Sequence, residues 1–294
     1  MTRTPTASTA LLLVLGAVVS VQFGGALAAT LVPQIGAAGS VVLRLGLATL
    51  ILGAVVRPRW RGHSRAAWAT VITFGAFLGA MNFSFYGSLA HLPIGVAVTI
   101  EFIGPLTLAV ALSRRPRDLV AVAAAALGVL LISQALTTPL ADLDWAGIAL
   151  ALTAGACWAG YIVYSGRTGA AFPQLEGLAW ALVVATIVVT PFGIWDLIVH
   201  GTDAWDGTVL AKGLGIAVLS SVLPYSLELL ALRRLAPAVF GILLSLEPAV
   251  AALAGLIVLD QRLSPVQLVG MGLVVTASAL VLGARKDPAE SAGS

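Results

Sequence analysis

Long apolar segments follow one another through the whole chain. Each is about 18–22 residues long, which matches an α-helix that crosses the roughly 30 Å hydrocarbon core of a bilayer. Short turn-forming or charged segments separate them, such as 57–65 (RPRWRGHSR), 113–118 (SRRPRD) and 139–144 (PLADLD). Only 10% of the residues are charged and 59% are hydrophobic, which leaves too few polar side chains to cover a soluble domain. The sequence therefore predicts an all-α integral membrane protein.

The apolar segments predict ten transmembrane helices and no separate soluble domain. The expected spans are 9–30, 39–56, 67–87, 94–113, 119–136, 145–165, 176–195, 212–232, 238–258 and 264–283. Arg3, the first apolar segment and Ala26-Leu27-Ala28 also resemble a secretory signal with its cleavage site. We expect no cleavage, because this segment is longer than the usual signal core and is needed for the repeat described below.

Basic residues predict the orientation of these spans. With a cytoplasmic N-terminus, thirteen of the sixteen Lys and Arg residues lie on the inner side, Lys212 and Arg262 lie outside, and Arg44 lies within a span. Cytoplasmic loops of membrane proteins carry an excess of Lys and Arg. Both termini are therefore expected in the cytoplasm.

The two halves of the chain resemble each other. When Pro93 is placed on Pro237, residues 81–98 align with residues 225–242 without a gap. Five spans per half is an odd number, so the halves would have opposite orientations, as in many transporters; chance similarity between apolar helices is the alternative. The predicted units are a first five-helix repeat (1–137), a second five-helix repeat (138–284) and a short cytoplasmic tail (285–294).

Four charged residues lie inside predicted spans: Arg44, Glu101, Glu228 and Glu247. A charged side chain in hydrocarbon is costly and commonly marks a substrate or ion pathway. At 1.5 Å per residue, Glu101 lies roughly 12 Å into its helix and Glu247 roughly 15 Å, near the midplane from opposite sides. Desolvation favours the neutral form of a carboxyl group, so we expect Glu101 and Glu247 to carry the coupling proton.

The other two charges have competing interpretations. Arg44 is predicted at a depth close to that of Glu101, so the two side chains could form a fixed ion pair, bind substrate, or do both. Glu228 lies five residues before Arg233 and could pair with Arg233 or Arg234, snorkel to the inner face, or act in transport.

Prolines and polar side chains surround these charges. Pro105, Pro224 and Pro248 each leave free the carbonyl four residues earlier, and we expect them to break their helices beside the acidic residues. The candidate pocket-lining residues are Gln22, Asn82, Tyr86, Trp158, Tyr161, Tyr225 and Ser226. Packing kinks and ordinary helix contacts are the alternative interpretations.

The residues expected of an enzyme or a metal site are missing from the predicted spans. They contain one cysteine, Cys157, no histidine and no deep aspartate, whereas hydrolysis or acyl transfer needs a nucleophile with a base, or a metal cluster. We therefore predict no enzymatic activity, no metal and no cofactor. A structural or assembly protein would not need carboxylates near the midplane, and nothing indicates a nucleic-acid partner.

Two stretches of the sequence resemble a known family. Residues 81–116 contain MN-x-x-FY, EF-x-GP and SRRP, and residues 219–253 contain LPYSLE and S-x-EPA; GACWAGYI follows the same pattern at 155–162. The likeness is to the EamA family of the drug/metabolite transporter superfamily and extends over almost the whole chain. It implies ten helices in inverted repeats, both termini inside a bacterial plasma membrane, and export of small amino acids of the threonine or homoserine kind, driven by inward proton flow.

The charges themselves are compatible with a zwitterionic substrate. Glu101 and Glu247 suit an ammonium group, and Arg44 suits a carboxylate. A phosphorylated substrate would favour several intramembrane Lys or Arg residues, and only one is present. The expected partners are therefore a small amino acid, protons and the lipid bilayer; an exporter of other small metabolites or lipophilic cations is the alternative.

Overall fold

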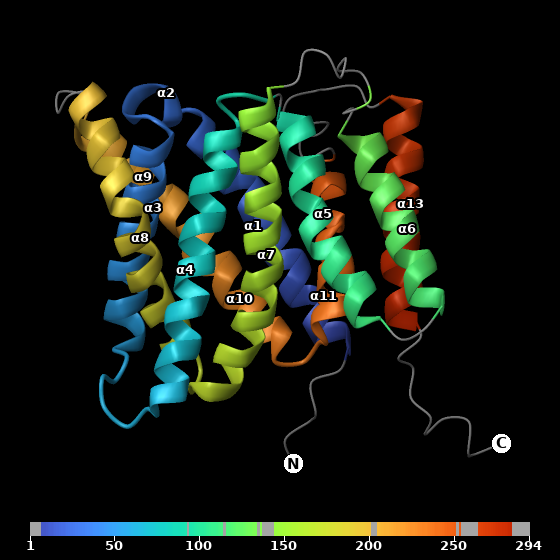
Figure 1. The fold of residues 1–294 in the computed structure, drawn as a ribbon, viewed down its shortest axis with the longest axis horizontal. Helices are drawn as coiled ribbons and strands as arrows, with labels where there is room; N and C mark the ends of the chain where they lie inside the picture. Colours follow the sequence, from blue (N-terminus) through green and yellow to red (C-terminus); the bar gives the residue numbers. More distant parts are fainter. Residues whose placement is uncertain are drawn as a thin grey trace.

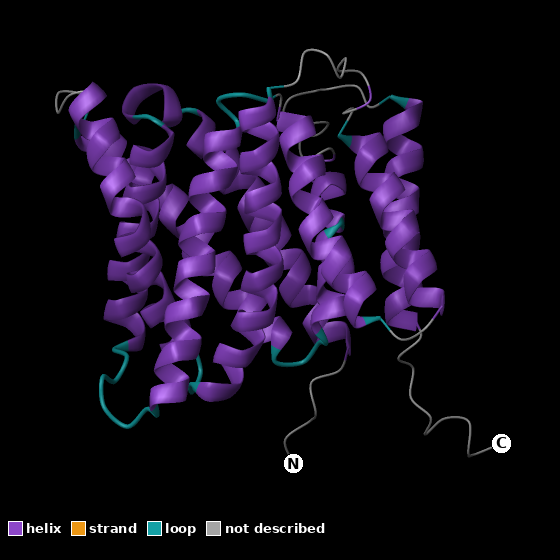
Figure 2. Cartoon of the chain, in the orientation of Figure 1, coloured by secondary structure: helices purple, strands orange, loops and turns teal. Residues whose placement is uncertain are grey.

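The computed structural model describes residues 7–92, 94–113, 116–133, 144–200, 205–250 and 264–283, with the single positions 136 and 253. Several features used in the sequence predictions lie outside the described residues: Arg3, Pro93, Arg262, most of the segment 139–144, most of 251–258 in the ninth predicted span, and the tail 285–294. The described part is helical, and no strand occurs in it (Figure 2). This confirms the predicted all-α fold class.

The helices lie where the apolar segments predicted them. Their bounds are α1 Ala7–Ala29, α2 Val32–Ile35, α3 Ala37–Val56, α4 Arg65–Ser88, α5 Ile94–Leu112, α6 Pro116–Ile132, α7 Trp145–Ala171, α8 Glu176–His200, α9 Gly207–Ala217, the π-helix η3 Val218–Val222, α10 Leu223–Leu232, α11 Pro237–Leu244 and α13 Pro265–Gly283. Residues 246–250 are also helical. Each predicted range contains described helix; the four-residue α2 was not predicted.

Length and composition identify membrane-crossing helices in the described chain. Five helices are long and apolar enough to cross a bilayer: Ala37–Val56, Arg65–Ser88, Trp145–Ala171, Glu176–Val199 and Gly207–Leu232. Four shorter apolar helices accompany them, at Thr9–Gly25, Val96–Leu112, Pro237–Val250 and Pro265–Leu280. Figure 1 shows the long helices standing side by side, with α1 beginning and α13 ending at the same lower face.

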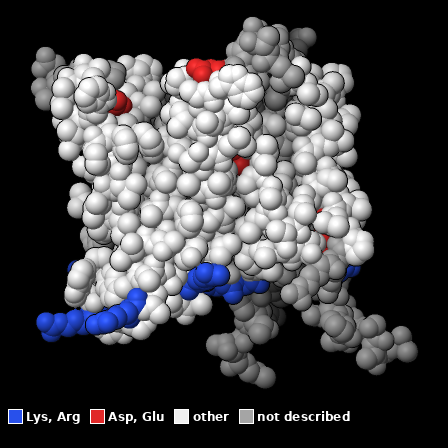
Figure 3. All heavy atoms as spheres, in the orientation of Figure 1, with Lys and Arg blue, Asp and Glu red and all other residues white. Residues whose placement is uncertain are grey.

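Charge is distributed unequally between the two ends of the helices. In Figure 3, Lys and Arg side chains gather along the lower edge. The connection from α3 to α4 at this end contains Arg57, Arg59 and Arg61, and the connection from α10 to α11 contains Arg233 and Arg234. The body between the two edges is almost free of basic side chains in this view, as expected of helices that face lipid.

A hydrogen-bonded pair holds the start of α7 at the opposite end. Asp144 Oδ1 accepts from the Ala146 N–H at 2.8 Å and so caps the helix, while its Oδ2 lies 2.7 Å from His91 Nδ1. These hydrogen bonds, first the one from the backbone and then the one from His91, lower the pKa of Asp144 below its usual value. The pair ties the segment after α4 to the helix that carries Trp158 and Tyr161.

The three prolines affect their helices differently. α5 continues through Pro105, so the predicted break is absent there. The carbonyl oxygen of Glu101, which Pro105 cannot bond, packs against Gly155 of α7 so closely that a Cβ on Gly155 would lie 2.5 Å from it. The freed carbonyl is therefore covered by a neighbouring helix backbone, and α5 has no need to bend open.

The helix around Pro224 is irregular but unbroken, because Gly207–Leu232 stays helical throughout, whereas the helix is interrupted near Pro248. Pro224 directly follows the π-helix η3, which includes Ser220, the residue whose carbonyl this proline leaves free. α11 ends at Leu244, the residue whose carbonyl Pro248 leaves free, and helix resumes at 246–250 after a turn at Ser245. A short teal segment within the purple helices in Figure 2 marks such a break.

Candidate functional site

A cavity of about 520 Å³ lies among the described helices. Volumes of about 300–1,000 Å³ are typical of small-molecule sites. Its lining comes from α1, α3, α4, α5, α6, α7, η3, α10 and the helical segment 246–250. The charged side chains among its lining residues are Arg44, Glu101, Glu228 and Glu247. The structure thus brings together all four charged residues predicted inside spans.

Arg44 of α3 is buried, with 5% of its surface exposed. Its Nη2 donates a hydrogen bond to Asn82 Oδ1, and its guanidinium carbon lies 5.2 Å from the ring centroid of Tyr86. Asn82 and Tyr86 lie one turn apart on α4, so they present an amide and a ring on the same face. Its Nε has no hydrogen-bond partner among the described residues.

The ion pair between Arg44 and Glu101, one of the alternatives left open by the sequence, is absent from the described structure. The reason lies in the packing of their helices. α3 packs chiefly against α8 and α9, whereas α5 packs against α7 and α11. The two residues share a depth in the bundle, but α4 supplies the groups that contact Arg44.

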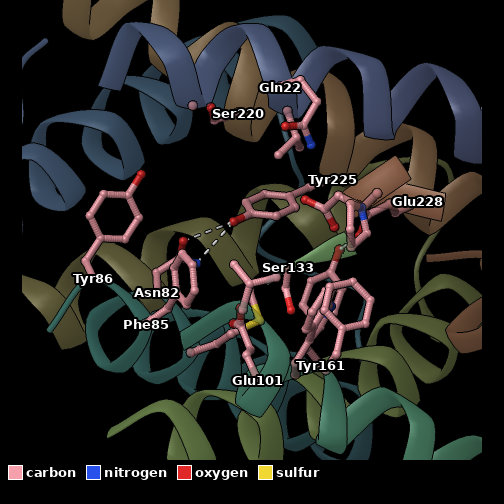
Figure 4. Close-up of a pocket in the computed structure, with 18 of the residues that line it drawn as sticks. Gln22, Asn82, Phe85, Tyr86, Glu101, Ser133, Tyr161, Ser220, Tyr225 and Glu228 are labelled. Atoms are coloured by element: carbon pink, nitrogen blue, oxygen red, sulfur yellow. Dashed lines mark hydrogen bonds between the residues drawn. The ribbon is translucent and has the colours of Figure 1, made fainter. Parts of the chain in front are cut away.

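Asn82 connects α4 to the second half of the chain. Its Nδ2 donates to the Leu78 carbonyl at 2.8 Å and to Tyr225 Oη at 3.1 Å (Figure 4). Tyr225 belongs to α10 and is 7% exposed. A continuous set of contacts therefore runs from Arg44 through Asn82 to Tyr225.

Glu228 of α10 is buried and hydrogen-bonded. Tyr161 Oη of α7 donates to Glu228 Oε2 at 2.7 Å. Pairing with Arg233 or Arg234, one of the alternatives for Glu228, does not occur: Arg233 donates to the carbonyls of Phe172 and Gln174 instead, and Arg234 to that of Leu230. Five residues along an α-helix amount to about 140° of rotation, so Glu228 and Arg233 point in different directions.

The polar groups lie on different sides of the cavity. Figure 4 shows Tyr86 and Asn82 on one side, Glu228 and Tyr161 on the other, and Tyr225 between them. Glu101 enters from below in this view, from α5. Because Arg44 contacts Asn82 and Tyr86, the guanidinium group belongs to the side opposite Glu228. The guanidinium group and the Glu228 carboxyl group therefore lie on opposite sides of the cavity, and Glu101 lies below and between them in this view.

Most of the predicted site residues line the cavity. They are Arg44, Glu101, Glu228, Glu247, Gln22, Asn82, Tyr86, Trp158, Tyr161, Tyr225 and Pro248. Ser226, Pro105 and Pro224 are outside the lining; the Ser226 hydroxyl donates to the Val222 carbonyl of its own helix.

Sequence reasoning missed several lining residues. Phe85 follows Asn82 by three positions and could have been found from helical spacing. Ser220 could have been found because Pro224 frees its carbonyl. Ser133, Met81 and Phe102 carried no signal beyond general polarity or size.

The Tyr161–Glu228 hydrogen bond predicts a measurable loss of stability. Tyr161→Phe removes the only described donor to a buried carboxyl group, and such a loss costs about 1–3 kcal/mol. We expect a lower midpoint of thermal unfolding in detergent. Tyr164→Phe, one turn further along α7, is the control because its hydroxyl makes no hydrogen bond to a described residue. Equal midpoints for the two variants would contradict the assignment.

Apolar helices around a buried cavity with charges of both signs define a class of protein, the helical membrane carriers. The EamA-like transporter family model matches residues 145–283. The chain belongs to the EamA-like transporter family. It is therefore an integral membrane transporter and not an enzyme.

Curated relatives cover nearly the whole chain. The threonine/homoserine exporter RhtA of Escherichia coli (strain K12) is 41% identical over 91% of this chain and 89% of its own length. RhtA of Salmonella typhimurium (strain SL1344) is 40% identical over 95% of this chain and 93% of its own. Protein PecM of Dickeya dadantii (strain 3937) is 28% identical over 71% of this chain and 70% of its own.

The fold is also found among solved structures, for example in a crystal structure that matches with a TM-score of 0.72 at 16% identity. The match covers 95% of this chain and 98% of that structure. At this identity the likeness shows the fold alone.

Proposed function

We propose that this protein exports small amino acids of the threonine or homoserine kind across a bacterial plasma membrane, in exchange for protons that enter the cell. The observation that carries the proposal is the set of charges around the cavity, one guanidinium group and three carboxyl groups. An amino acid needs an anionic partner for its ammonium group and a cationic partner for its carboxylate. The relatives named as threonine/homoserine exporters support the same substrate class.

Ten transmembrane helices in two inverted repeats are part of the proposal. Under this scheme α1 corresponds to α7, α3 to α8, α4 to α9 and α10, α5 to α11, and α6 to α13. The packing supports the correspondence: α3 packs on α8, α5 on α11 and α6 on α13, each a pair of equivalent helices. Likewise α4 packs on α7 as α1 packs on α10, and α4 packs on α8 as α3 packs on α9.

The mechanism that we propose is alternating access at this cavity. Glu101 and Glu247 come from the equivalent helical segments α5 and 237–250. A proton and the substrate ammonium group compete for their carboxyl oxygens, so that the site carries one or the other. Rocking of the two halves exposes the cavity to each side in turn, and the helix break between Leu244 and 246 offers a hinge near Glu247.

Both termini are placed in the cytoplasm by the proposal, because the basic connections at the lower face in Figure 3 fit the inner side of a plasma membrane. The test uses a background with Cys157→Ser, into which one cysteine is introduced at a time. Trp60→Cys places it at the lower face, and Trp145→Cys places it at the upper face. Trp60 is 68% exposed and Trp145 is 81% exposed. We expect an impermeant thiol reagent to label position 145 in whole cells and to reach position 60 only after lysis. Labelling of position 60 in intact cells would reverse the orientation.

The experiment that tests the function is counterflow in proteoliposomes. Protein reconstituted with unlabelled L-threonine inside should accumulate labelled L-threonine from outside, and an imposed proton gradient should drive net uphill movement. An absence of counterflow with L-threonine, L-homoserine and other small amino acids would contradict the proposal.

Export of lipophilic cations is the second candidate, because aromatic rings join the carboxyl groups in the lining. Phe85, Tyr86, Phe102 and Trp158 are all present there, and such rings attract cations. Counterflow of a labelled lipophilic cation, unaffected by excess L-threonine, would favour this alternative.

A further inference from the structure

The guanidinium group of Arg44 lacks an anionic partner among the described residues. Its side chain is buried, yet its partners in the structure are the amide of Asn82 and the ring of Tyr86, both neutral. No carboxylate of the described residues forms an ion pair with it. A buried charge without a counter-ion is strongly unfavourable. A purely structural role therefore does not account for Arg44 at this position.

The guanidinium group nevertheless has a defined position. Asn82 Oδ1 accepts from its Nη2, and Asn82 is itself held by hydrogen bonds to the Leu78 carbonyl and Tyr225 Oη. Tyr86 stacks against it from the same face of α4. These contacts occupy Nη2 and leave Nε, a buried atom, without a partner among the described residues, while Arg44 as a residue lines the cavity.

We infer that Arg44 binds the α-carboxylate of the transported amino acid, and that Asn82 and Tyr225 are positioning residues for it. The inference rests on the proposed function and adds the orientation of the substrate. The carboxylate lies on the side of Asn82 and Tyr86, which contact Arg44, and the ammonium group points away from it toward the cavity's carboxyl groups, of which Glu228 lies on the opposite side in Figure 4. The planar guanidinium group matches a carboxylate in geometry as well as in charge.

This orientation makes a free carboxylate a requirement for binding. L-threoninamide has the ammonium group, the hydroxyl and the shape of L-threonine but lacks the anion. At about pH 6 the amine of both molecules is protonated. Loss of one partner of a buried charge pair weakens binding by about 100-fold, so the wild-type protein should prefer the acid to the amide by roughly this factor.

The test measures competition of unlabelled L-threonine and L-threoninamide against labelled L-threonine, on full-length protein in detergent. Arg44→Gln should reduce the affinity for L-threonine by about 100-fold and leave that for the amide nearly unchanged. Arg167→Gln is the matched control: Arg167 lies 5.0 Å from the Tyr164 ring in a similar contact but is exposed and outside the cavity lining. It should keep the wild-type preference for the acid.

Tyr225→Phe keeps the ring and removes the oxygen that holds Asn82. It should weaken L-threonine binding by about threefold to tenfold while sparing the amide. A general packing defect would weaken the binding of both ligands equally. Tyr225→Phe therefore tests the inference even if Arg44→Gln fails to fold.

Three outcomes overturn the inference. Equal affinity of the wild-type protein for acid and amide would do so while leaving the proposed function intact, and so would an equal loss of both ligands in Tyr225→Phe. A wild-type protein that neither binds L-threonine nor catalyses its counterflow would overturn the proposed function, and this inference with it.

Discussion

Replacement of Glu101 or Glu247 with glutamine is expected to abolish uphill export while leaving the folded protein in the membrane. Glutamine keeps the shape and much of the hydrogen bonding of glutamate but cannot release or accept the coupling proton. A carrier without an exchangeable proton at this site can still equilibrate a solute but cannot use a proton gradient to concentrate it. The measurement is transport of labelled L-threonine against its gradient in proteoliposomes with an imposed proton gradient.

The pH dependence of binding has a defined sign in this mechanism. A proton and the ammonium group compete for the same carboxyl oxygens, so L-threonine affinity of the wild-type protein should fall as the pH is lowered from about 8 to about 5. In Glu101→Gln with Glu247→Gln this dependence should be strongly reduced, because two of the three carboxyl groups that line the cavity have been removed and only Glu228 remains. Binding itself should be weaker, since the ammonium group has lost these anionic partners.

Glu176→Gln is the matched control for both measurements. Glu176 is the first residue of α8 and lies 3.5 Å from His63, away from the cavity. The variant should keep uphill export and its pH profile. If Glu101→Gln and Glu247→Gln, each tested alone, export uphill at the wild-type rate with an unchanged pH profile, the two carboxyl groups are structural and the mechanism is wrong.

The helices and most of the cavity lining were predictable from the sequence. Both depend on the hydrocarbon core of the bilayer, which determines the length of each helix and makes a buried charge costly. Apolar runs must be about as long as the bilayer is thick, which located the helices within a few residues. A charge inside such a run is costly unless it faces other protein or a cavity. That single rule selected Arg44, Glu101, Glu228 and Glu247, all of which line the cavity.

The partners of those charges were not predictable, because a sequence position defines depth but neither rotation nor neighbours. Their similar depth made a pair of Arg44 and Glu101 one of the alternatives, yet the contacts of Arg44 come from α4, which supplies Asn82 and Tyr86. For Glu228, pairing with Arg233 was one of the open alternatives, but rotation along α10 directs it to Tyr161 on α7. Both corrections depend on which helices pack together, which is a property of the whole bundle.

The prolines illustrate the same limit. Each removes one hydrogen bond, but the consequence depends on what covers the freed carbonyl. Beside Pro248 the helix ends at Leu244 and restarts at 246. At Pro105 the backbone of Gly155 covers the carbonyl of Glu101, and α5 stays continuous. Only the tertiary contact distinguishes a break from a regular helix.

The close contact between α5 and α7 at Gly155 gives the largest effect on folding that we predict. Gly104 of α5 lies one turn from Glu101, and a Cβ at this position would overlap with the backbone carbonyl of Gly155 on α7. Backbone cannot rotate out of the way as a flexible side chain can, so Gly104→Ala must push the two helices apart. Overpacking of this kind costs about 1–3 kcal/mol, and we expect a clearly lower midpoint of thermal unfolding and a reduced folded yield.

Gly53→Ala separates this steric effect from the general effect of removing a helical glycine. Gly53 lies within α3, and a Cβ there would meet nothing within 4 Å. Alanine favours a helix over glycine by about 0.5–1 kcal/mol, so Gly53→Ala should be neutral or slightly stabilising.

Displacement of α5 also moves Glu101, so the Gly104→Ala protein that does fold should bind L-threonine more weakly. Equal stability of the Gly104→Ala and Gly53→Ala proteins would show that α5 and α7 do not meet at these glycines.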